Sequence, residues 1–161
     1  GHVTTTNTIR QAGWAPGALV LLLDIGKGFI PTFFALRAGL PAWSVALTAA
    51  LAVMGHCWPL FAGFRGGMGL ATTGGTLLAV SVPGFLIALA TLIALTLTIR
   101  HSARAALFAG ILAPILFWLL DFHGAELWVM VAAGLVIVAR FSIDWNRQYR
   151  ELWLDREKVG G

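Results

Sequence analysis

The sequence predicts an all-α protein, a polytopic integral membrane bundle of about six helices that forms a single domain over residues 1–161. Two observations lead to this fold class. Of the 161 residues, 58% are hydrophobic and only 11% are charged, whereas roughly a quarter of the residues of a soluble domain are charged. The apolar residues also gather into long runs, enough for four or five spans of about 20 residues each. The regular alternation of a membrane β-barrel is absent from the sequence.

Glycine, proline and charged residues mark where the apolar runs begin and end. Residues 16–36 and 42–62 form the first two predicted helices, and Gly39-Leu40-Pro41 makes the turn between them. Residues 63–69 form a glycine-rich loop, which is too flexible for a helix interior. The next run, 70–99, is too long for one ordinary span and contains Pro83-Gly84 near its middle. We expect two shorter helices that meet at this break.

The last part of the chain predicts two more helices and a surface segment. The helices are expected over 105–120 and 126–139, on either side of a turn that begins at Asp121. From Arg140 onward the sequence is amphipathic and charged. We expect this tail, residues 142–161 in particular, to lie along the cytoplasmic surface of the membrane.

The positions of the basic residues support a break at Pro83. With this break, one side of the membrane holds nine basic residues and the other side only Arg37. The positive-inside rule then assigns the basic side to the cytoplasm, and the tryptophans fall near the span ends as in an aromatic belt. The basic residues form no stripe, so the net charge of +4 does not indicate a nucleic-acid partner. The nine are Arg10, Arg65, Arg100, Arg104, Arg140, Arg147, Arg150, Arg156 and Lys158.

Several common catalytic patterns are missing from the sequence. It contains no nucleophile elbow, no zinc-protease histidine pair and no Walker lysine loop. No histidine is followed five positions later by aspartate, the pattern of CoA-dependent acyltransferases. Cys57 is the only cysteine, and we expect it to pack as a small apolar residue. The four histidines have no carboxylate or cysteine cluster nearby, so we expect neither a metal nor another cofactor.

Polar residues expected on the cytoplasmic side predict an anion site. A glycine loop that leads into a helix brings backbone N–H groups close to an anion, and the helix dipole favours negative charge there. Arginine adds a permanent charge with a geometry suited to phosphate. We therefore expect a phosphorylated ligand at the membrane surface. The residues concerned are Thr6, Asn7, Arg10, His56, Arg65, Gly66, Gly67 and Gly69.

Each of these residues also has a purely structural interpretation. His56 could be an interfacial histidine, the arginines could only orient the chain, and Thr6 and Asn7 could cap the first helix. Asp24 and Lys27 lie three residues apart inside an apolar run, where isolated charges are costly. We expect these two to pair with each other or with a neighbour, as a structural pair rather than as substrate contacts.

Three segments carry a family resemblance when they are taken together and in order. They are Thr6-Asn7-Thr8-Ile9-Arg10, then Leu23-Asp24-Ile25-Gly26-Lys27-Gly28, then Gly55-His56-Cys57-Trp58-Pro59-Leu60-Phe61 followed by Phe64-Arg65-Gly66-Gly67-Met68-Gly69-Leu70-Ala71-Thr72. These segments resemble the motifs of the bacterial acyl-phosphate:glycerol-3-phosphate acyltransferases, the PlsY type. The resemblance covers essentially the whole chain.

The sequence departs from the family pattern at three places. Met68 stands where the family has a lysine. The first serine of the family's first motif would lie just before residue 1, so we expect a divergent member that lacks the N-terminal first span. Near the C-terminus, Arg140-Phe141-Ser142-Ile143-Asp144-Trp145-Asn146-Arg147 follows the family's Arg-His-x-x-Asn-x-x-Arg pattern only loosely. Asp144 stands where the asparagine would be, and Asn146 lies two residues later.

The resemblance implies the first acylation step of phospholipid synthesis, at the cytoplasmic face of the bacterial plasma membrane. The 1-hydroxyl of glycerol 3-phosphate would attack the carbonyl of an acyl phosphate and yield 1-acyl-glycerol 3-phosphate and inorganic phosphate. Because an acyl phosphate carries a good leaving group, no cofactor, metal or covalent intermediate is implied.

The resemblance also implies two kinds of role for individual residues. Catalytic groups bind phosphate or move the hydroxyl proton, namely His56, Arg10 and Arg65. Substrate-binding groups orient the polyol or hold phosphate, namely Thr6, Asn7, Gly66, Gly67, Gly69 and Asn146.

Two other functions stay open at this point. Met68 and the altered first motif suggest a catalytically impaired relative that binds phosphorylated lipid precursors. Asp24, Lys27 and the break at Pro83 suggest a small membrane transporter. An internal repeat would favour transport, and the sequence shows none.

Overall fold

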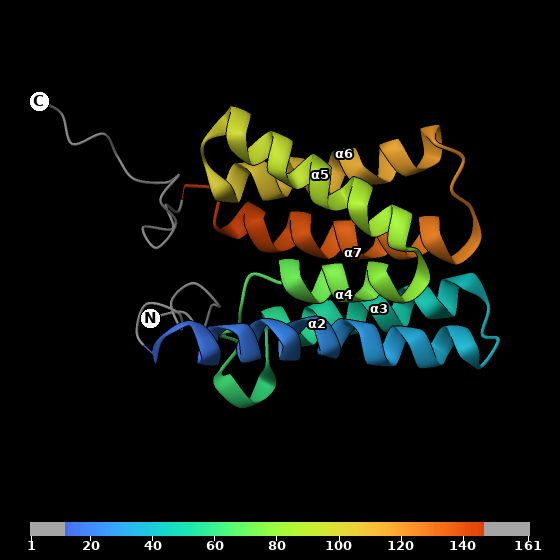
Figure 1. The fold of residues 1–161 in the computed structure, drawn as a ribbon, viewed down its shortest axis with the longest axis horizontal. Coiled ribbons are helices and arrows are strands. Elements are labelled where there is room, and N and C mark those ends of the chain that lie inside the picture. Colours follow the sequence, from blue (N-terminus) through green and yellow to red (C-terminus); the bar gives the residue numbers. More distant parts are fainter. Residues whose placement is uncertain (1–11, 147–161) are drawn as a thin grey trace, which may run out of the picture.

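The computed structural model describes residues 12–146, which form a bundle of six α-helices and one short 3-10 turn (Figure 1). Five of the described segments are long and apolar enough to cross a membrane, and only α4, with 11 residues, is too short. The prediction of a helical membrane bundle is thereby confirmed. The elements are α2 (Trp14–Arg37), α3 (Ala42–Cys57), η1 (Leu60–Ala62), α4 (Leu70–Val80), α5 (Val82–Ile99), α6 (Ser102–Leu119) and α7 (Gly124–Ile143).

The connections between the helices gather at the two ends of the bundle. The loop between α3 and α4, the α5–α6 junction and the end of α7 lie at one end (Figure 1). The α2–α3 turn, the α4–α5 break and the α6–α7 turn lie at the other end. This is the alternation that the basic residues predict, because Arg65, Arg100 and Arg104 all belong to the first end and Arg37 to the second.

The predicted break between two shorter helices is present, and it lies at Ser81, two residues before Pro83. Ser81 has extended backbone with φ −162°, and its hydroxyl accepts a hydrogen bond from the Gly84 N–H at 3.2 Å. Pro83 then sits in the first turn of α5, where its missing N–H costs nothing. The serine cap and the proline together start a new helix.

The ends of α3 and α7 differ most from the sequence-based prediction. α3 ends at Cys57 instead of reaching residue 62. Pro59 follows shortly after this end and precedes the 3-10 turn. Because proline disfavours helical backbone at the residue before it, the helix cannot easily continue through Trp58. α7 continues through Ile143, so the expectation that a surface segment begins at Arg140 is wrong. Arg140 is buried and pairs with Asp144, whose Oδ2 lies 2.7 Å from the guanidinium. The pair allows a charged residue to stay inside the bundle.

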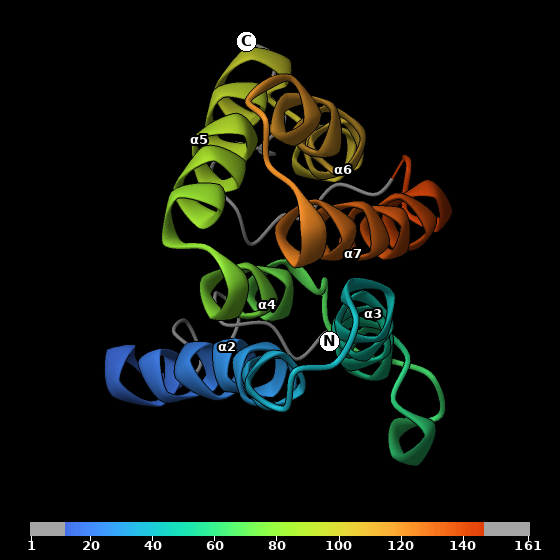
Figure 2. The ribbon, with the colours of Figure 1, turned by 90° about the vertical axis from the view of Figure 1, so that its right-hand side faces the viewer.

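Glycines bring the helices together where they cross. A Cβ at Gly28 of α2 would collide with the carbonyl oxygen of Thr72, and a Cβ at Gly75 of α4 would collide with that of Ile25. Small residues of this kind allow close backbone approach in membrane helices. α4 therefore lies against α2, while α7 packs on both α3 and α6 (Figure 2).

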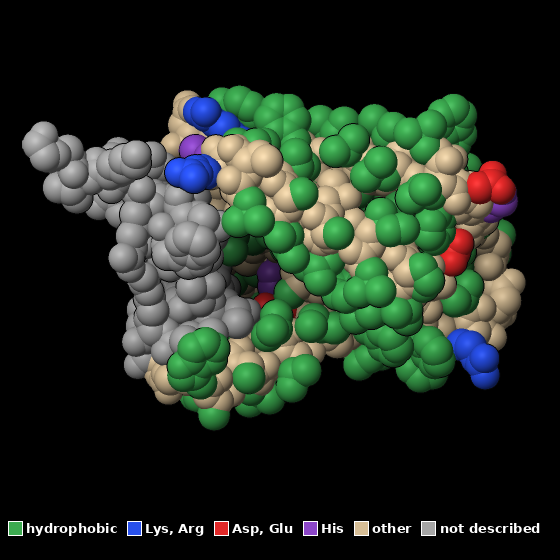
Figure 3. Space-filling model, turned by 45° about the horizontal axis from the view of Figure 1, so that its top comes forward, with side chains coloured by type: hydrophobic (Ala, Val, Ile, Leu, Met, Phe, Trp, Pro, Cys, Tyr) green, Lys and Arg blue, Asp and Glu red, His purple; other side chains and the backbone are tan. Residues whose placement is uncertain are grey.

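The outer surface of the bundle is apolar. Large hydrophobic side chains are exposed along α2, α5 and α6, and they cover much of the face seen in Figure 3. Apart from the acidic atoms in the hollow, the charged side chains on this face lie at the two ends (Figure 3). Such a surface is suited to lipid rather than to water.

Candidate active site

Two adjoining cavities open beside the glycine-rich loop. The outer cavity, of about 510 Å³, lies between α2, α3 and the loop, and Asp24, Lys27, His56 and Arg65 are among its lining residues. The middle cavity, of about 410 Å³, shares Asp24, His56 and Gly67 with it and extends between α2, α4 and α5. Figure 3 shows a hollow in the apolar surface with histidine and acidic atoms at its base. The site therefore has a polar part and an apolar extension.

Asp24 is at the centre of the polar part. Its Oδ1 accepts a hydrogen bond from Lys27 Nζ at 3.0 Å and lies 3.4 Å from His56 Nδ1. The Asp24 and His56 side chains are 9% and 10% exposed, whereas Lys27 is 59% exposed. The predicted pair of Asp24 and Lys27 is confirmed. The carboxylate also faces the histidine, and Asp24 and Lys27 both line the outer cavity, so this pair lies at the candidate site.

The glycine loop is folded tightly against the end of α3. The Gly67 N–H donates to the carbonyl oxygen of His56 at 3.1 Å. A Cβ at Gly66 would collide with this same carbonyl oxygen, and a Cβ at Gly67 would collide with the His56 imidazole. Gly69 has φ +82° and forms the N-cap of α4. The glycines are thus required for close approach, and they place the loop backbone beside His56 and ahead of a helix N-terminus.

Arg140 reaches this loop from the far end of the sequence. Its Nε donates to the carbonyl oxygen of Gly67 at 3.3 Å, and its Nη1 donates to the Asp144 carboxylate at 2.7 Å. The guanidinium therefore fixes the loop from α7. Sequence reasoning treated Arg140 as an orientation charge and missed this role, although the loosely matching C-terminal pattern that begins at Arg140 was a signal for it.

The other sequence-predicted site residues are placed as follows. Arg65 is exposed and lines the outer cavity. Asn146 is exposed and lines neither cavity. The positions of Thr6, Asn7 and Arg10 lie outside the described residues.

Met68 and Cys57 have apolar environments. Met68 is half-buried, packs against the core formed by α3, α6 and α7, and lines the middle cavity. Cys57 is 1% exposed and belongs to the same core, so the prediction that it packs as a small apolar residue is confirmed. Among residues 12–146, no three histidine, cysteine or acidic side chains are grouped so that they could hold a metal ion.

The sequence model of a family described as glycerol-3-phosphate acyltransferase matches residues 1–151 of the chain. The chain belongs to the glycerol-3-phosphate acyltransferase family. A family member from Shewanella sp. (strain ANA-3) is 37% identical over 158 residues, which cover 98% of this chain and 78% of that protein. Another from Shewanella woodyi is 34% identical over 159 residues, covering 99% and 79%. The resemblance found in the motifs is thus confirmed.

Two solved structures of the family have the same fold. They are crystal structures of PlsY (YgiH), an integral membrane glycerol 3-phosphate acyltransferase, in the glycerol 3-phosphate form and in the lysophosphatidic acid form. The TM-scores are 0.76 and 0.78 at 33% identity. Each alignment covers 91% of this chain, and 74% and 76% of the respective PlsY chain.

Proposed function

We propose that this protein transfers an acyl group from an acyl phosphate to the 1-hydroxyl of glycerol 3-phosphate, the first acylation of phospholipid biosynthesis. Family membership supports acylation of glycerol 3-phosphate, and the two PlsY forms support this substrate and a lysophosphatidic acid product. The observation that carries the proposal is the outer cavity, where a histidine–carboxylate pair lies beside Arg65, Lys27 and a glycine loop.

The reaction needs positioning and one proton transfer. The hydroxyl oxygen of glycerol 3-phosphate attacks the acyl carbonyl carbon, the bond to the phosphate oxygen breaks, and inorganic phosphate leaves with the electron pair. The hydroxyl proton must be removed as the new ester forms. Since the phosphate is already a good leaving group, the protein has to hold two anions close together and stabilise the charge that develops.

His56 is the proposed group for the proton or for a phosphate contact. Its Nδ1 faces Asp24 at 3.4 Å, and its ring lies against Gly67. A carboxylate beside one ring nitrogen orients the imidazole. Asp24 is therefore a positioning residue in this proposal, and His56 presents its other nitrogen toward the loop.

The proposed phosphate contacts come from cations around the cavity. Arg65 and Lys27 line the outer cavity, and both side chains are exposed. The backbone of Gly66, Gly67 and Gly69 precedes the N-terminus of α4, where anions are favoured. Arg10 is proposed as a further phosphate contact, and Thr6 and Asn7 as contacts to the polyol, whereas the position of Asn146 outside both cavities gives its predicted polyol contact no support.

The proposed location is the bacterial plasma membrane, with the active site facing the cytoplasm. The glycine loop lies at the same end of the bundle as Arg100 and Arg104 (Figure 1). The basic end of a membrane protein faces the cytoplasm, and the relatives compared above are bacterial.

Acyl transfer with purified protein in liposomes tests the reaction. Radiolabelled glycerol 3-phosphate is supplied with palmitoyl phosphate or with palmitoyl-CoA, and radiolabelled lysophosphatidate and inorganic phosphate are measured. We expect turnover with palmitoyl phosphate only. Equal turnover with the CoA ester would overturn the acyl-phosphate donor, and turnover with neither would overturn the enzyme assignment.

A matched pair of histidine variants tests the site within the same assay. His56→Ala is expected to lower kcat/KM by about 10²–10⁴-fold, the usual contribution of a general acid–base group. The control is His123→Ala, because His123 is 73% exposed and lies in the α6–α7 turn at the opposite end of the bundle. Equal activity of the two variants would remove His56 from the mechanism.

A further inference from the structure

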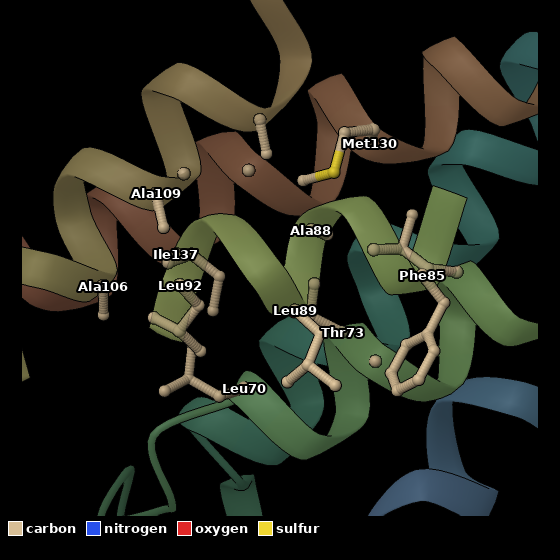
Figure 4. A pocket seen from close by; sticks show the side chains of 15 residues that line it. Leu70, Thr73, Phe85, Ala88, Leu89, Leu92, Ala106, Ala109, Met130 and Ile137 are labelled. Atoms are coloured by element: carbon tan, nitrogen blue, oxygen red, sulfur yellow. The ribbon is translucent and has the colours of Figure 1, made fainter. Parts of the chain in front are cut away.

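α6 has an inner and an outer face. On the inner face, Ala106 and Ala109 are buried and line a small apolar space among α4, α5, α6 and α7 (Figure 4). Among residues 103–110, only Arg104 and Phe108 are not buried. These two are four residues apart, so they share the outer face, and two exposed isoleucines continue their row. This outer stripe of α6 consists of Arg104, Phe108, Ile111 and Ile115.

The outer stripe begins at a cluster of basic side chains where α5 meets α6. Arg100 ends α5, His101 is the N-cap of α6, and Arg104 lies in its first turn. We refer to these three residues as the basic cluster. Figure 3 shows basic side chains and a histidine side by side at this end of the molecule. α6 has no side-chain cap and no acidic residue in its first turn, so its N-terminus adds a further preference for an anion.

The described part of the chain does not neutralise the basic cluster. No carboxylate among residues 12–146 forms an ion pair with Arg100 or Arg104. His101 Nδ1 and Arg104 Nε are buried without a hydrogen-bond partner there. Buried polar atoms nearly always have a partner, so such an exception points to a water, an ion or a ligand. The basic cluster is therefore suited to an anion from outside the chain.

Two aromatic rings place the basic cluster at the depth of lipid headgroups. Arg104 Cζ lies 5.1 Å from the centre of the Trp145 ring, and Phe108 meets the same ring edge-on with 6.1 Å between centroids. Tryptophan is enriched where the headgroups of a membrane meet its hydrocarbon core. The charged end of the outer stripe thus lies at this boundary, and its apolar part extends into the hydrocarbon.

We propose that the outer face of α6 binds one anionic phospholipid, with its phosphate at the basic cluster and one acyl chain along the outer stripe. Guanidinium groups donate strong hydrogen bonds to phosphate oxygens, and basic pockets at the ends of membrane helices hold anionic headgroups. From Arg104 to Ile115 the stripe spans about 16 Å at 1.5 Å per residue. This length is about half of the 30 Å hydrocarbon core, the share of one leaflet.

This lipid site is separate from the candidate active site. No residue of the basic cluster lines the outer or the middle cavity. The inference therefore does not depend on acyl transfer, and its tests measure lipid binding alone. A free phosphate ion would use the basic cluster but would leave the apolar stripe without a role, so competition by inorganic phosphate separates the two occupants.

The first experiment titrates the full-length protein in detergent with phosphatidylglycerol or with phosphatidylcholine of the same acyl chains. Retained lipid is counted by native mass spectrometry. Only phosphatidylglycerol carries a net negative charge, and each basic residue beside an anionic headgroup strengthens binding. We therefore expect its first molecule to bind about tenfold more tightly or better. Equal affinities would overturn the lipid site. Displacement by inorganic phosphate at constant ionic strength would also overturn it, in favour of a free anion.

Two arginines that each lie over an aromatic ring provide matched variants. Arg104 lies over Trp145 in the basic cluster, whereas Arg37 lies over Phe33 at the opposite end of the bundle. Arg104→Gln is expected to remove the preference for phosphatidylglycerol and to leave phosphatidylcholine binding unchanged. Arg37→Gln is expected to keep the wild-type preference. Equal losses in the two variants would show an effect of net charge alone and would overturn the site.

A second measurement on the wild-type protein keeps the inference testable if Arg104→Gln does not fold. Phosphatidylglycerol and phosphatidylcholine, each with a photoreactive diazirine in one acyl chain, are bound in liposomes and irradiated. We expect the phosphatidylglycerol probe to enrich crosslinks at Phe108 and Ile111 of α6 over Leu22, which is exposed on α2. The phosphatidylcholine probe should show no such enrichment. The same crosslink distribution for both probes would contradict a lipid site on α6.

Discussion

Arg65 provides a test of the proposed phosphate site at the scale of a single side chain. It lines the outer cavity beside the glycine loop, and its charge is permanent. We expect Arg65→Ala to lose about 2–4 kcal/mol of transition-state stabilisation, as when one preorganised donor is removed. The measurement is kcat/KM for glycerol 3-phosphate. The control is Arg37→Ala. Arg37 is the last residue of α2, lies over the Phe33 ring, and is at the end of the bundle opposite the glycine loop. Equal losses in the two variants would contradict the anion site.

Met68 tests whether the protein is fully active or an impaired relative. Met68 stands where the PlsY pattern has a lysine, and its side chain packs against the α3–α6–α7 core. Lys27 and Arg65 already supply two cations to the outer cavity. We therefore expect Met68→Lys to change turnover with palmitoyl phosphate less than about tenfold, which corresponds to about 1.4 kcal/mol. A gain of tenfold or more would show that the wild-type chain is a weakened enzyme.

The sequence predicts that residues of one continuous motif lie together. It does not predict contacts between residues that are far apart in the sequence. His56, Arg65 and the glycines follow one another closely, so their shared site was predictable. Arg140 meets Gly67 across 73 residues, and an arginine at the end of an apolar run has an ordinary explanation as an orientation charge. No sequence pattern indicates that Asp24 has His56 as a second partner besides Lys27, because α2 and α3 meet only after folding.

At the scale of elements, the crossing of α2 and α4 depends on two glycines. Gly28→Ala is expected to lower protein stability by about 1–3 kcal/mol, because its methyl group would collide with the Thr72 carbonyl oxygen. Gly26→Ala on the same helix is the control, since its Cβ would meet only Ile30 Cδ1 at 3.9 Å. Alanine favours helix over glycine, so the control should be neutral or slightly stabilised. Thermal unfolding in detergent measures both, and a stable Gly28→Ala variant would contradict the close crossing.

The sequence predicts that most of the helices exist, but it predicts the residues at which they begin and end less well. Long apolar runs indicate helices, and Pro83 indicates a break between two of them. The sequence places α7 over 126–139, but the buried pair of Arg140 and Asp144 extends it to Ile143. Arg140 in this extension also contacts the glycine loop. The sequence around Arg140 contains no local pattern that predicts such a long-range contact.

At the scale of the whole molecule, the bundle predicts which loops share a side of the membrane. Ala62→Cys and Ser142→Cys should react with an impermeant thiol reagent from the same side, and Val82→Cys from the opposite side. All three positions are exposed, whereas Cys57 is 1% exposed and gives little background. Val82 is preferred to Gly84, where a Cβ would lie 2.9 Å from Phe117 Cζ. Labelling of Val82→Cys from the same side as Ser142→Cys would contradict the break at Ser81.

The contact between Arg140 and the glycine loop has a consequence for biosynthesis. A ribosome delivers the chain from its N-terminus, so α2, α3 and the loop enter the membrane well before α7. Until α7 arrives, the Gly67 carbonyl oxygen has no guanidinium to hold it. A nascent or prematurely terminated chain that stops before Arg140 therefore lacks this contact to the glycine loop, even though it already contains His56 and Arg65. The glycine loop is therefore held from α7 only after this helix has been made and has packed beside α3.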